Sequence, residues 1–312
     1  SLNNEQLQAV ENVAKFPLTI ITGGPGVGKT TVVGEIVRRA KFAKMRIMLC
    51  APTGRAAKRL GESCHHYAMT IHRMMKWDPI AKTFVHNERL PLNCDLLIVD
   101  EVSMLDVSIA IYLFRAIKTG TSVVMVGDAD QLPSVGPGTV LRDIILSEKI
   151  PVTHLFQIYR QSENSRIITN AHAVNSGRMP DIRPVQKTQI CDFYWIDQDD
   201  PERALPIISE MFVERIPKRF KLTPAKDIQV ITPMNKGSCG TISLNKILQD
   251  KINPASGNKP QFHYGETVFR SGDKVMQTVN KYEKCVFNGD LGRIIHINSS
   301  ESKFKVAFDH AD

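Results

Sequence analysis

The sequence predicts an α/β protein whose first half forms a parallel sheet, and three observations support this fold class. Strand-like and helical stretches alternate along residues 18–155, which is typical of parallel strands joined by helices. The strand candidates are nearly all apolar, as expected of strands covered on both faces. Polar or glycine-rich segments follow four of them, at the sheet edge where α/β proteins bind ligands. We expect strands at residues 18–22, 46–50, 96–100, 122–127 and 152–155.

The composition is that of a globular protein with a basic surface. The chain has 312 residues, and a usual domain size of about 100–200 residues suggests two domains. No apolar run approaches the ~18 residues of a membrane span, no secretory signal is visible, and the six cysteines lack C-x-x-C spacing. These features predict a cytoplasmic protein with reduced thiols and no membrane partner. The net charge of +8 suits a polyanionic partner without identifying it.

The segment ITGGPGVGKTT, residues 21–31, has the features of a phosphate-binding loop. Its glycines accept positive φ angles, so the chain can curl with its N–H groups pointing inward. The apolar spacing that follows predicts a helix, whose N-terminus attracts anions. The segment fits G-x-x-x-x-G-K-[ST], in which Lys29 meets the β- and γ-phosphates of ATP and Thr30 ligates Mg²⁺. The alternative is a glycine-rich turn with an incidental lysine.

The third strand candidate ends in two adjacent carboxylates, Asp100 and Glu101. Adjacent acids at a strand end can divide the work of hydrolysis. We expect Asp100 to hold Mg²⁺ through water and Glu101 to orient and deprotonate the attacking water. Such pairs also occur by chance, so the acid pair indicates nucleotide hydrolysis only in combination with the glycine-rich loop.

Two further residues are candidates for reading the γ-phosphate. Gln131 follows the fourth strand and can hydrogen-bond the γ-phosphate or the attacking water. Its alternative is a turn capped by an aspartate, which Pro133 and Gly136 would also fit. Arg160 lies just past the fifth strand, in the position of an arginine finger that stabilises transition-state charge. Its alternative is an ordinary surface arginine.

The organisation of the chain indicates three parts. We expect a first lobe at residues 1–158, a second at 159–264, and a small β-rich section at 265–312 with Gly and Asn turns. A β-hairpin interrupts the first lobe at about residues 75–92, turning through Asp78 and Pro79.

Nine sequence blocks in order resemble the superfamily 1 DNA helicases of the RecD type, a group that includes the exodeoxyribonuclease V alpha subunits. The resemblance runs from Leu2 to about Gly292. The blocks are LNNEQLQAV, GGPGVGKTT, APTGRAAKRL, TIHRM, IVDEVSMLD, GDADQLPSVGPG, IYRQSENS, ITPMNKGSCGTISLN and VFNGDLG.

The resemblance implies a P-loop NTPase fold with two RecA-like lobes, each built on a parallel sheet, and ATP and Mg²⁺ between them. It further implies single-stranded DNA across the top of the lobes, with the hairpin separating strands and residues 265–312 starting an SH3-like β-barrel. The implied activity is ATP-dependent 5′→3′ translocation coupled to duplex unwinding in DNA repair and recombination.

The resemblance also assigns individual residues to tasks. Catalysis falls to Lys29, Asp100, Glu101, Gln131 and Arg160, and Mg²⁺ binding to Thr30 and Asp100. Nucleotide binding falls to Gln6, at the adenine, and to Gly23, Gly24, Pro25, Gly26, Val27, Gly28, Lys29, Thr30 and Thr31. DNA binding falls to Thr53, Gly54, Arg55, Thr70 and His72 in the first lobe and to Pro233, Lys236, Thr241 and Asn245 in the second.

Physical chemistry agrees with this assignment of the DNA contacts. Hydroxyls and backbone N–H groups grip phosphates without reading sequence, and Arg55 adds charge, so we expect sequence-tolerant, salt-sensitive binding. Trp77 and Phe84 of the hairpin either stack on a base at the fork or pack on their own lobe. Residues 64–66, Cys-His-His, lack a second ligand pair and are not expected to bind a metal.

Two family blocks are not found before Asp312: one of the His-Lys-Ser-Gln-Gly kind and one ending in a second catalytic arginine. The chain also begins abruptly at the adenine motif, so we expect a fragment that binds nucleotide, hydrolyses it feebly and unwinds nothing alone.

The expected partners are single-stranded DNA and single-strand/double-strand junctions, with RecB/RecC-type subunits if the chain is the motor of an exonuclease complex. A P-loop ATPase acting as a switch or DNA clamp is the alternative. A nuclease has little support, because the carboxylate pair is already assigned to Mg²⁺-ATP.

Overall fold

The computed structural model divides the chain into two compact units, Ser1–Trp195 (unit 1) and Ile196–Asp312 (unit 2). This division falls later in the chain than the predicted lobe boundary at residue 158, and the lobe boundaries stay predictions. The structure describes residues 2–78, 80–81, 83–157, 165–186, 189–257, 259–279, 281, 284, 286, 288–298 and 303–308.

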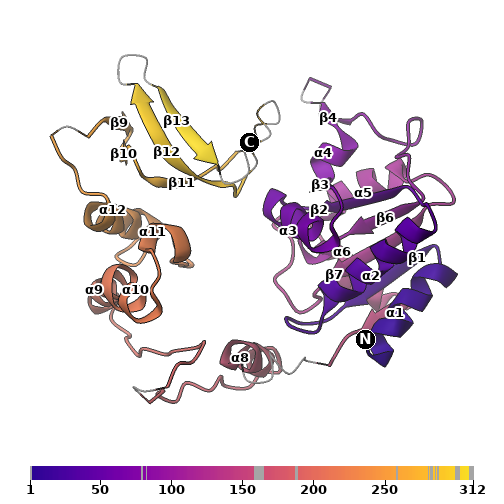
Figure 1. Ribbon diagram of the computed structural model, residues 1–312, viewed down its shortest axis with the longest axis horizontal. Helices are drawn as coiled ribbons and strands as arrows, with labels where there is room; N and C mark the ends of the chain where they lie inside the picture. The colour runs from indigo at the N-terminus through magenta and orange to yellow at the C-terminus, as the bar shows by residue number, and fades with distance from the viewer. Residues whose placement is uncertain are drawn as a thin grey trace. The chain divides into compact units, whose positions relative to one another are not determined.

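Unit 1 is built on a six-stranded sheet in which every neighbouring pair of strands is parallel. The strand order is β3-β2-β6-β7-β1-β8 (Figure 1). The strands are β1 (Leu18–Thr22), β2 (Ile47–Ala51), β3 (Ala68–Thr70), β6 (Leu96–Val99), β7 (Ser122–Gly127) and β8 (Val152–His154). All five predicted strands are present within one residue at each end. Strand β3 was not predicted, because three residues are too few to show a pattern.

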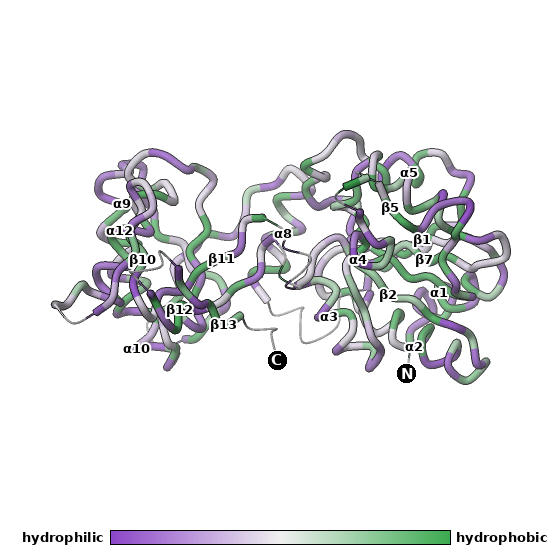
Figure 2. Tube along the Cα trace, turned by 90° about the horizontal axis from the view of Figure 1, so that it is seen from above, coloured by the Kyte–Doolittle hydropathy of each residue, from purple (hydrophilic) through white to green (hydrophobic). Residues whose placement is uncertain are grey.

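Helices cover both faces of this sheet and bury alternate strand side chains in two apolar cores. Ile21 and Ile98 pack with α1, α2 and α3, whereas Ile20 and Leu97 pack with α4 and α5 on the opposite face. The apolar character of β1 and β7 is visible in Figure 2. The helices are α1 (Asn4–Lys15), α2 (Lys29–Phe42), α3 (Gly54–Cys64), α4 (Ile71–Met75), the 3₁₀ helix η1 (Val102–Met104), α5 (Val107–Ala116), α6 (Val140–Leu146) and α8 (Arg166–Asn175).

The predicted hairpin is present as antiparallel strands β4 (Trp77–Asp78) and β5 (Thr83–Phe84). Phe84 is only 2% exposed, and its ring lies 4.9 Å from that of Trp77 and 5.2 Å from that of Tyr112 in α5. Of the two roles predicted for the hairpin aromatics, Phe84 therefore packs on its own lobe and is not available to stack on a base. At the apex, Asp78 Oδ1 accepts hydrogen bonds from the backbone N–H groups of Ile80 and Ala81.

Unit 2 combines helices with small antiparallel sheets. Its elements are α9 (Pro201–Glu210), the π-helix η2 (Met211–Arg215), α10 (Ile216–Phe220), α11 (Pro224–Asp227), α12 (Thr241–Ile252), β9 (Gln261–Tyr264), β10 (Thr267–Arg270), β11 (Lys274–Met276), β12 (Leu291–Asn298) and β13 (Lys303–Phe308). The strands pair as β9–β10 and β11–β12–β13, consistent with the predicted β-rich section.

The described residues between 165 and 260 contain no strand, so they do not form the parallel sheet expected of a second RecA-like lobe. Two strand-like apolar runs of that region, residues 193–196 and 228–232, have no regular secondary structure. Instead, side chains join helix α12 to the β-strands. Asp273 accepts hydrogen bonds from Gln249, Asn253 and the Arg270 backbone, and the Arg270 guanidinium pairs with Asp250 at 2.7 Å.

Candidate functional site

The glycine-rich loop joins β1 to α2 and has the geometry of an anion cradle. Gly26 and Gly28 have φ angles of 79° and 83°, in the left-handed region that glycine adopts without strain. A Cβ on Gly23 would lie 2.5 Å from the Leu155 carbonyl oxygen, so the backbone passes too close for any side chain there. Helix α2 has no side-chain cap at its N-terminus, and its first N–H groups are therefore free to face an anion.

Lys29 lies inside this loop, where the charges of three carboxylates act on it. Its Nζ donates hydrogen bonds to the carbonyl oxygens of Gly23 (2.5 Å) and Gly24 (2.9 Å). Burial lowers the pKa of Lys29, while Asp128, Glu101 and Asp100 act in the opposite direction. The incidental-lysine alternative does not fit this placement, because Lys29 is turned into the loop.

The two predicted carboxylates follow β6 directly. Asp100 Oδ1 accepts a hydrogen bond of 2.9 Å from the backbone N–H of Glu101. Glu101 has a φ of 52°, a left-handed conformation that is costly for a residue with a side chain and is often found at functional sites. Burial raises the pKa of both groups, and for Glu101 the neighbouring Asp100 adds to the effect. A glutamate with a raised pKa is a better proton acceptor.

Asp128 organises the turn after β7. Its carboxylate accepts hydrogen bonds from the Asp130 backbone N–H (3.1 Å) and from Gln131 Nε2 (3.3 Å). The aspartate-capped turn, proposed as the alternative to a sensor, is therefore present. The same contacts hold Gln131 beside Asp128, whose charge acts on Lys29. The aspartate-capped turn is therefore compatible with the predicted role of Gln131 as a γ-phosphate sensor.

The remaining predicted nucleotide residues lie around the loop. Thr30 and Thr31 start α2 and are exposed, whereas Val27 is buried beneath the loop. Gln6 is fully buried: its Nε2 donates to the Val27 carbonyl and its Oε1 accepts from the Asn3 N–H. In this structure Gln6 ties α1 to the loop, and its contact with adenine stays a prediction. Arg160 lies outside the described residues.

The first-unit DNA candidates come together at the carboxyl ends of β2 and β3. Thr53 caps α3 by accepting from the Ala56 N–H, and Thr70 caps α4 by accepting from the Arg73 N–H. Arg55 is exposed on the first turn of α3, next to Gly54, which begins that helix. A cavity of about 230 Å³ adjoins them. Its lining comes from four loops and helix ends: Pro52, Thr53, Ile71, His72, Met104, Leu105, Asp106, Ile109, Pro133, Ser134, Val135 and Gly136.

His72 connects this cavity to the hairpin. Its ring lies 5.6 Å from that of Phe84, and burial lowers its pKa. The four DNA candidates of unit 2 are in the first turns of α12 and in the segment that precedes it. The Thr241 backbone N–H donates to the Met234 carbonyl, and Pro233, Lys236 and Asn245 are exposed nearby in the chain.

Sequence reasoning missed one residue of the nucleotide site. The charge of Arg59 reaches Lys29, Asp100 and Glu101, although the sequence places it in a basic cluster with Arg55 and Lys58. The sequence did contain a signal for this: Arg59 follows Arg55 by four residues, which places both side chains on the same face of a helix.

Two exclusions hold for the described part of the chain. No group of three or more His, Cys, Asp or Glu residues there has the geometry of a metal site. None of the described helices is long and apolar enough to cross a membrane.

The fold and the loop define a P-loop nucleotide-binding protein. Residues 6–137 match the AAA domain family, and residues 244–308 match the SH3 domain family of ATP-dependent RecD-like DNA helicases. Among solved structures, the fold is similar to two Pif1 helicases at 20% identity. One, from a study of two coordinating Pif1 helicases at forked double-stranded DNA, has a TM-score of 0.56 and 75% of its chain covered. The other, Bacteroides Pif1 bound to single-stranded DNA, has a TM-score of 0.54 and 73% covered.

Relatives found by sequence similarity narrow the class of P-loop protein to the RecD-type helicases. The ATP-dependent RecD2 DNA helicase of Deinococcus radiodurans is 36% identical over 99% of this chain and 40% of its own length. The RecBCD enzyme subunit RecD of Mycobacterium tuberculosis is 28% identical over 94% of this chain and 55% of its own length. The chain is thus a relative of the RecD-type helicases, as the sequence blocks predicted, and spans about half the length of the curated relatives it matches.

Proposed function

We propose that this chain forms the ATP-driven motor core of a RecD-type DNA helicase. One observation carries the proposal: Lys29 is held inside the glycine-rich loop, and the charges of Asp100, Glu101 and Asp128, which follow two further strands, act on it. The similarity to the Deinococcus RecD2 helicase over 99% of the chain supports it.

In this proposal the residues of the loop bind and polarise the triphosphate. Lys29 exchanges its two carbonyl partners for phosphate oxygens, and the N-terminus of α2 adds its N–H groups. Glu101 takes the proton of the attacking water, and its raised pKa suits that role. Gln131 reports the presence of the γ-phosphate, and Arg160 acts as the arginine finger. Gln6 binds adenine.

The oxygen donors at the site fit Mg²⁺. Mg²⁺ prefers carboxylate, hydroxyl and phosphate oxygens, and Asp100 and Thr30 provide the first two next to Lys29. Bound there with ATP, the ion would neutralise phosphate charge during cleavage.

We propose single-stranded DNA and single-strand/double-strand junctions as the track. Arg55, Gly54 and the capped N-termini of α3 and α4 offer charge and N–H groups to phosphates, while Thr53, Thr70 and His72 line or adjoin the cavity beside them. Pro233, Lys236, Thr241 and Asn245 complete the assignment in unit 2. Translocation is expected to run 5′→3′.

A second candidate is the motor subunit of a RecBCD-like exonuclease complex, favoured by the similarity to RecBCD enzyme subunits. In that case RecB- and RecC-type proteins should co-purify with the full-length protein from its own cells. A protein that purifies alone and still unwinds DNA would rule this candidate out.

The proposed function is tested by ATP turnover of the full-length protein with and without single-stranded DNA. We expect stimulation by DNA and a loss of at least about 100-fold in Lys29→Ala, because the lysine stabilises charge only in the nucleotide complex. The exposed Lys15→Ala, on the outside of α1, is the control. Turnover that is unchanged in Lys29→Ala would contradict the proposal.

A further inference from the structure

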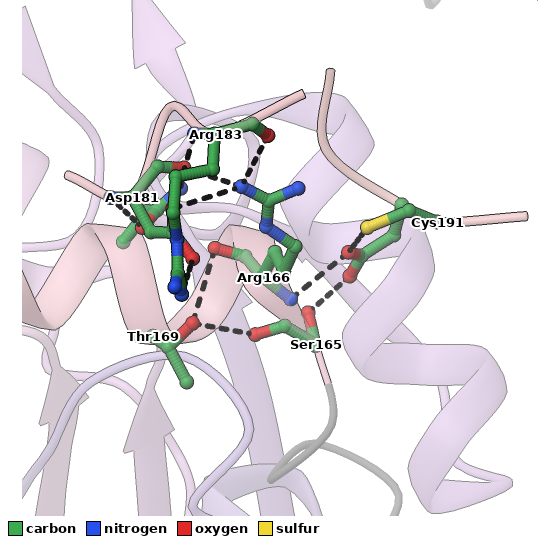
Figure 3. A network of polar contacts seen from close by, with 8 residues as sticks. Ser165, Arg166, Thr169, Asp181, Arg183 and Cys191 are labelled. Atoms are coloured by element: carbon green, nitrogen blue, oxygen red, sulfur yellow. Dashed lines mark hydrogen bonds and ion pairs between the residues drawn. The ribbon is translucent and has the colours of Figure 1, made fainter. Parts of the chain in front are cut away.

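Helix α8 is held in place by a polar network at its N-terminal end (Figure 3). Ser165, the N-cap residue, accepts from the Ile168 N–H and its hydroxyl donates to Asp192. The Arg166 backbone N–H donates to Asp192 Oδ1 at 2.9 Å. The first turn of α8 is thereby fixed to a segment that lies almost 30 residues further along the chain.

A second set of contacts fixes the rotation of α8 about its axis. The Arg166 guanidinium donates to the carbonyl oxygens of Asp181 and Arg183 and forms an ion pair of 3.2 Å with the Asp181 carboxylate. Asn170, one turn later and only 5% exposed, exchanges two hydrogen bonds with the Asp181 backbone. Because the helix is held from one side at two successive turns, the direction of its other side chains is determined.

The side chain that this arrangement directs toward the phosphate-binding loop is His172. A Cβ placed on Gly24 would lie 3.0 Å from Cε1 and 3.6 Å from Nε2 of its imidazole, so the ring lies against the loop. Lys29 Nζ donates to the carbonyl oxygen of the same glycine. The imidazole and the ammonium therefore meet the loop at a single residue.

The imidazole has an unused hydrogen-bonding atom at this position. His172 Nε2 is buried, and no partner for it exists among the residues that the structure describes. A buried polar atom without a partner is unfavourable, whereas a phosphate oxygen bound in the loop would be a good acceptor for an N–H at Nε2. Lys29 marks the end of the loop where the terminal phosphate belongs, because its amine lies at Gly23 and Gly24.

We propose that His172 is a nucleotide-binding residue, contributed by α8, that donates a hydrogen bond to the terminal phosphate of a bound nucleoside triphosphate. The inference rests on the proposed function, since it assumes that the loop binds nucleotide. Because a diphosphate lacks the terminal group, His172 favours ATP over ADP.

The test compares two affinities in the full-length protein: that for a non-hydrolysable ATP analogue and that for ADP, both by titration calorimetry. We expect His172→Ala to weaken analogue binding by about 10-fold, the loss of one hydrogen bond to a charged group, and to leave ADP binding within about 2-fold. His172→Gln keeps an N–H donor and should retain part of the preference. His86→Ala, whose ring hydrogen-bonds the Leu90 carbonyl away from the phosphate-binding loop, should bind both ligands like the wild type.

Three outcomes would overturn the inference. Equal weakening of both ligands by His172→Ala would show that the histidine only shapes the loop. Unchanged affinities with a lower melting temperature would show a purely structural side chain. In either case a wild type that binds ATP leaves the proposed function intact. If the wild type binds neither nucleotide, the proposed function itself fails, and the inference fails with it.

Discussion

Unit 1 and unit 2 differ in how much the packing of their strands depends on buried charged groups. In unit 1 the strand side chains are apolar on both faces of the sheet, as at Leu97 and Ile98, and each face is covered by helices. Unit 2 also has buried apolar side chains, such as Leu244 and Ile294, but its strands are in addition joined to α12 through buried charged groups, Arg270 and Asp273. Apolar burial is non-directional and averages over many contacts, whereas a polar network depends on every partner being present. The rigid sheet of unit 1 is therefore the part suited to position a catalytic loop.

The largest effect is expected within the site that the unit 1 sheet positions. Glu101→Gln keeps the size of the side chain but cannot accept the proton of water, so ATP turnover should fall by about 10²–10⁴-fold. ATP affinity should stay close to that of the wild type, because Lys29 and the loop are unchanged. Steady-state turnover and nucleotide titration of the full-length protein separate the two quantities, and a parallel loss of binding would contradict this role.

The apolar core of unit 1 provides the next effect. Leu97→Ala removes a fully buried side chain and should lower the free energy of unfolding by ~2–5 kcal/mol. Leu146→Ala, at a position that is 68% exposed, is the matched control and should change it by no more than about 0.5 kcal/mol. Urea unfolding measures both variants. Equal effects would show that the sheet does not carry the stability of this unit.

The polar network of unit 2 should respond less strongly and only locally. Asp273→Ala removes one acceptor group and takes one hydrogen bond each from the Gln249 amide, the Asn253 amide and the Arg270 backbone N–H, which should cost ~1–3 kcal/mol. Hydrogen exchange should accelerate at β10 and α12, while β1 and β7 stay protected. Asp199→Ala, in an exposed loop, is the control. Uniform loss of protection over both units would contradict the contrast between them.

A surface pair of unit 1 should give the smallest effect, and one that depends on pH. The Arg46 guanidinium beside Asp95 holds the pKa of that carboxyl below its ordinary value of 3.8. A depressed pKa adds stability above the unfolded-state value, and this stability is lost as the pH falls through the folded-state value. Asp95→Asn should therefore be slightly less stable than wild type at neutral pH, with the difference vanishing in acid. A difference that grows as the pH falls would refute the sign.

Much of unit 1 could be predicted from the sequence, because its strands are continuous apolar runs and its loop has fixed glycine positions. The positions of Lys29, Asp100 and Glu101 followed from that pattern, since parallel strands present their carboxyl ends at one edge. The approach of His172 to Gly24 could not be predicted, because it depends on how α8 is oriented by contacts distant in sequence.

Two other differences have local causes. Phe84 alternates with exposed neighbours in the hairpin, and the sequence alone does not say which face of so short a strand meets α5. The expected sheet at residues 159–264 requires several strands, and the described residues there form none before β9, although residues 193–196 and 228–232 are strand-like in sequence.

The central claim is that ATP cleavage at the loop of unit 1 drives movement along DNA. The most direct measurement is strand separation of a duplex with a 5′ single-stranded tail by the full-length protein and by its Glu101→Gln variant. The account predicts separation by the wild type with ATP, none with a non-hydrolysable analogue, and none by the variant although it binds both ATP and DNA. Strand separation by Glu101→Gln at the wild-type rate would contradict it.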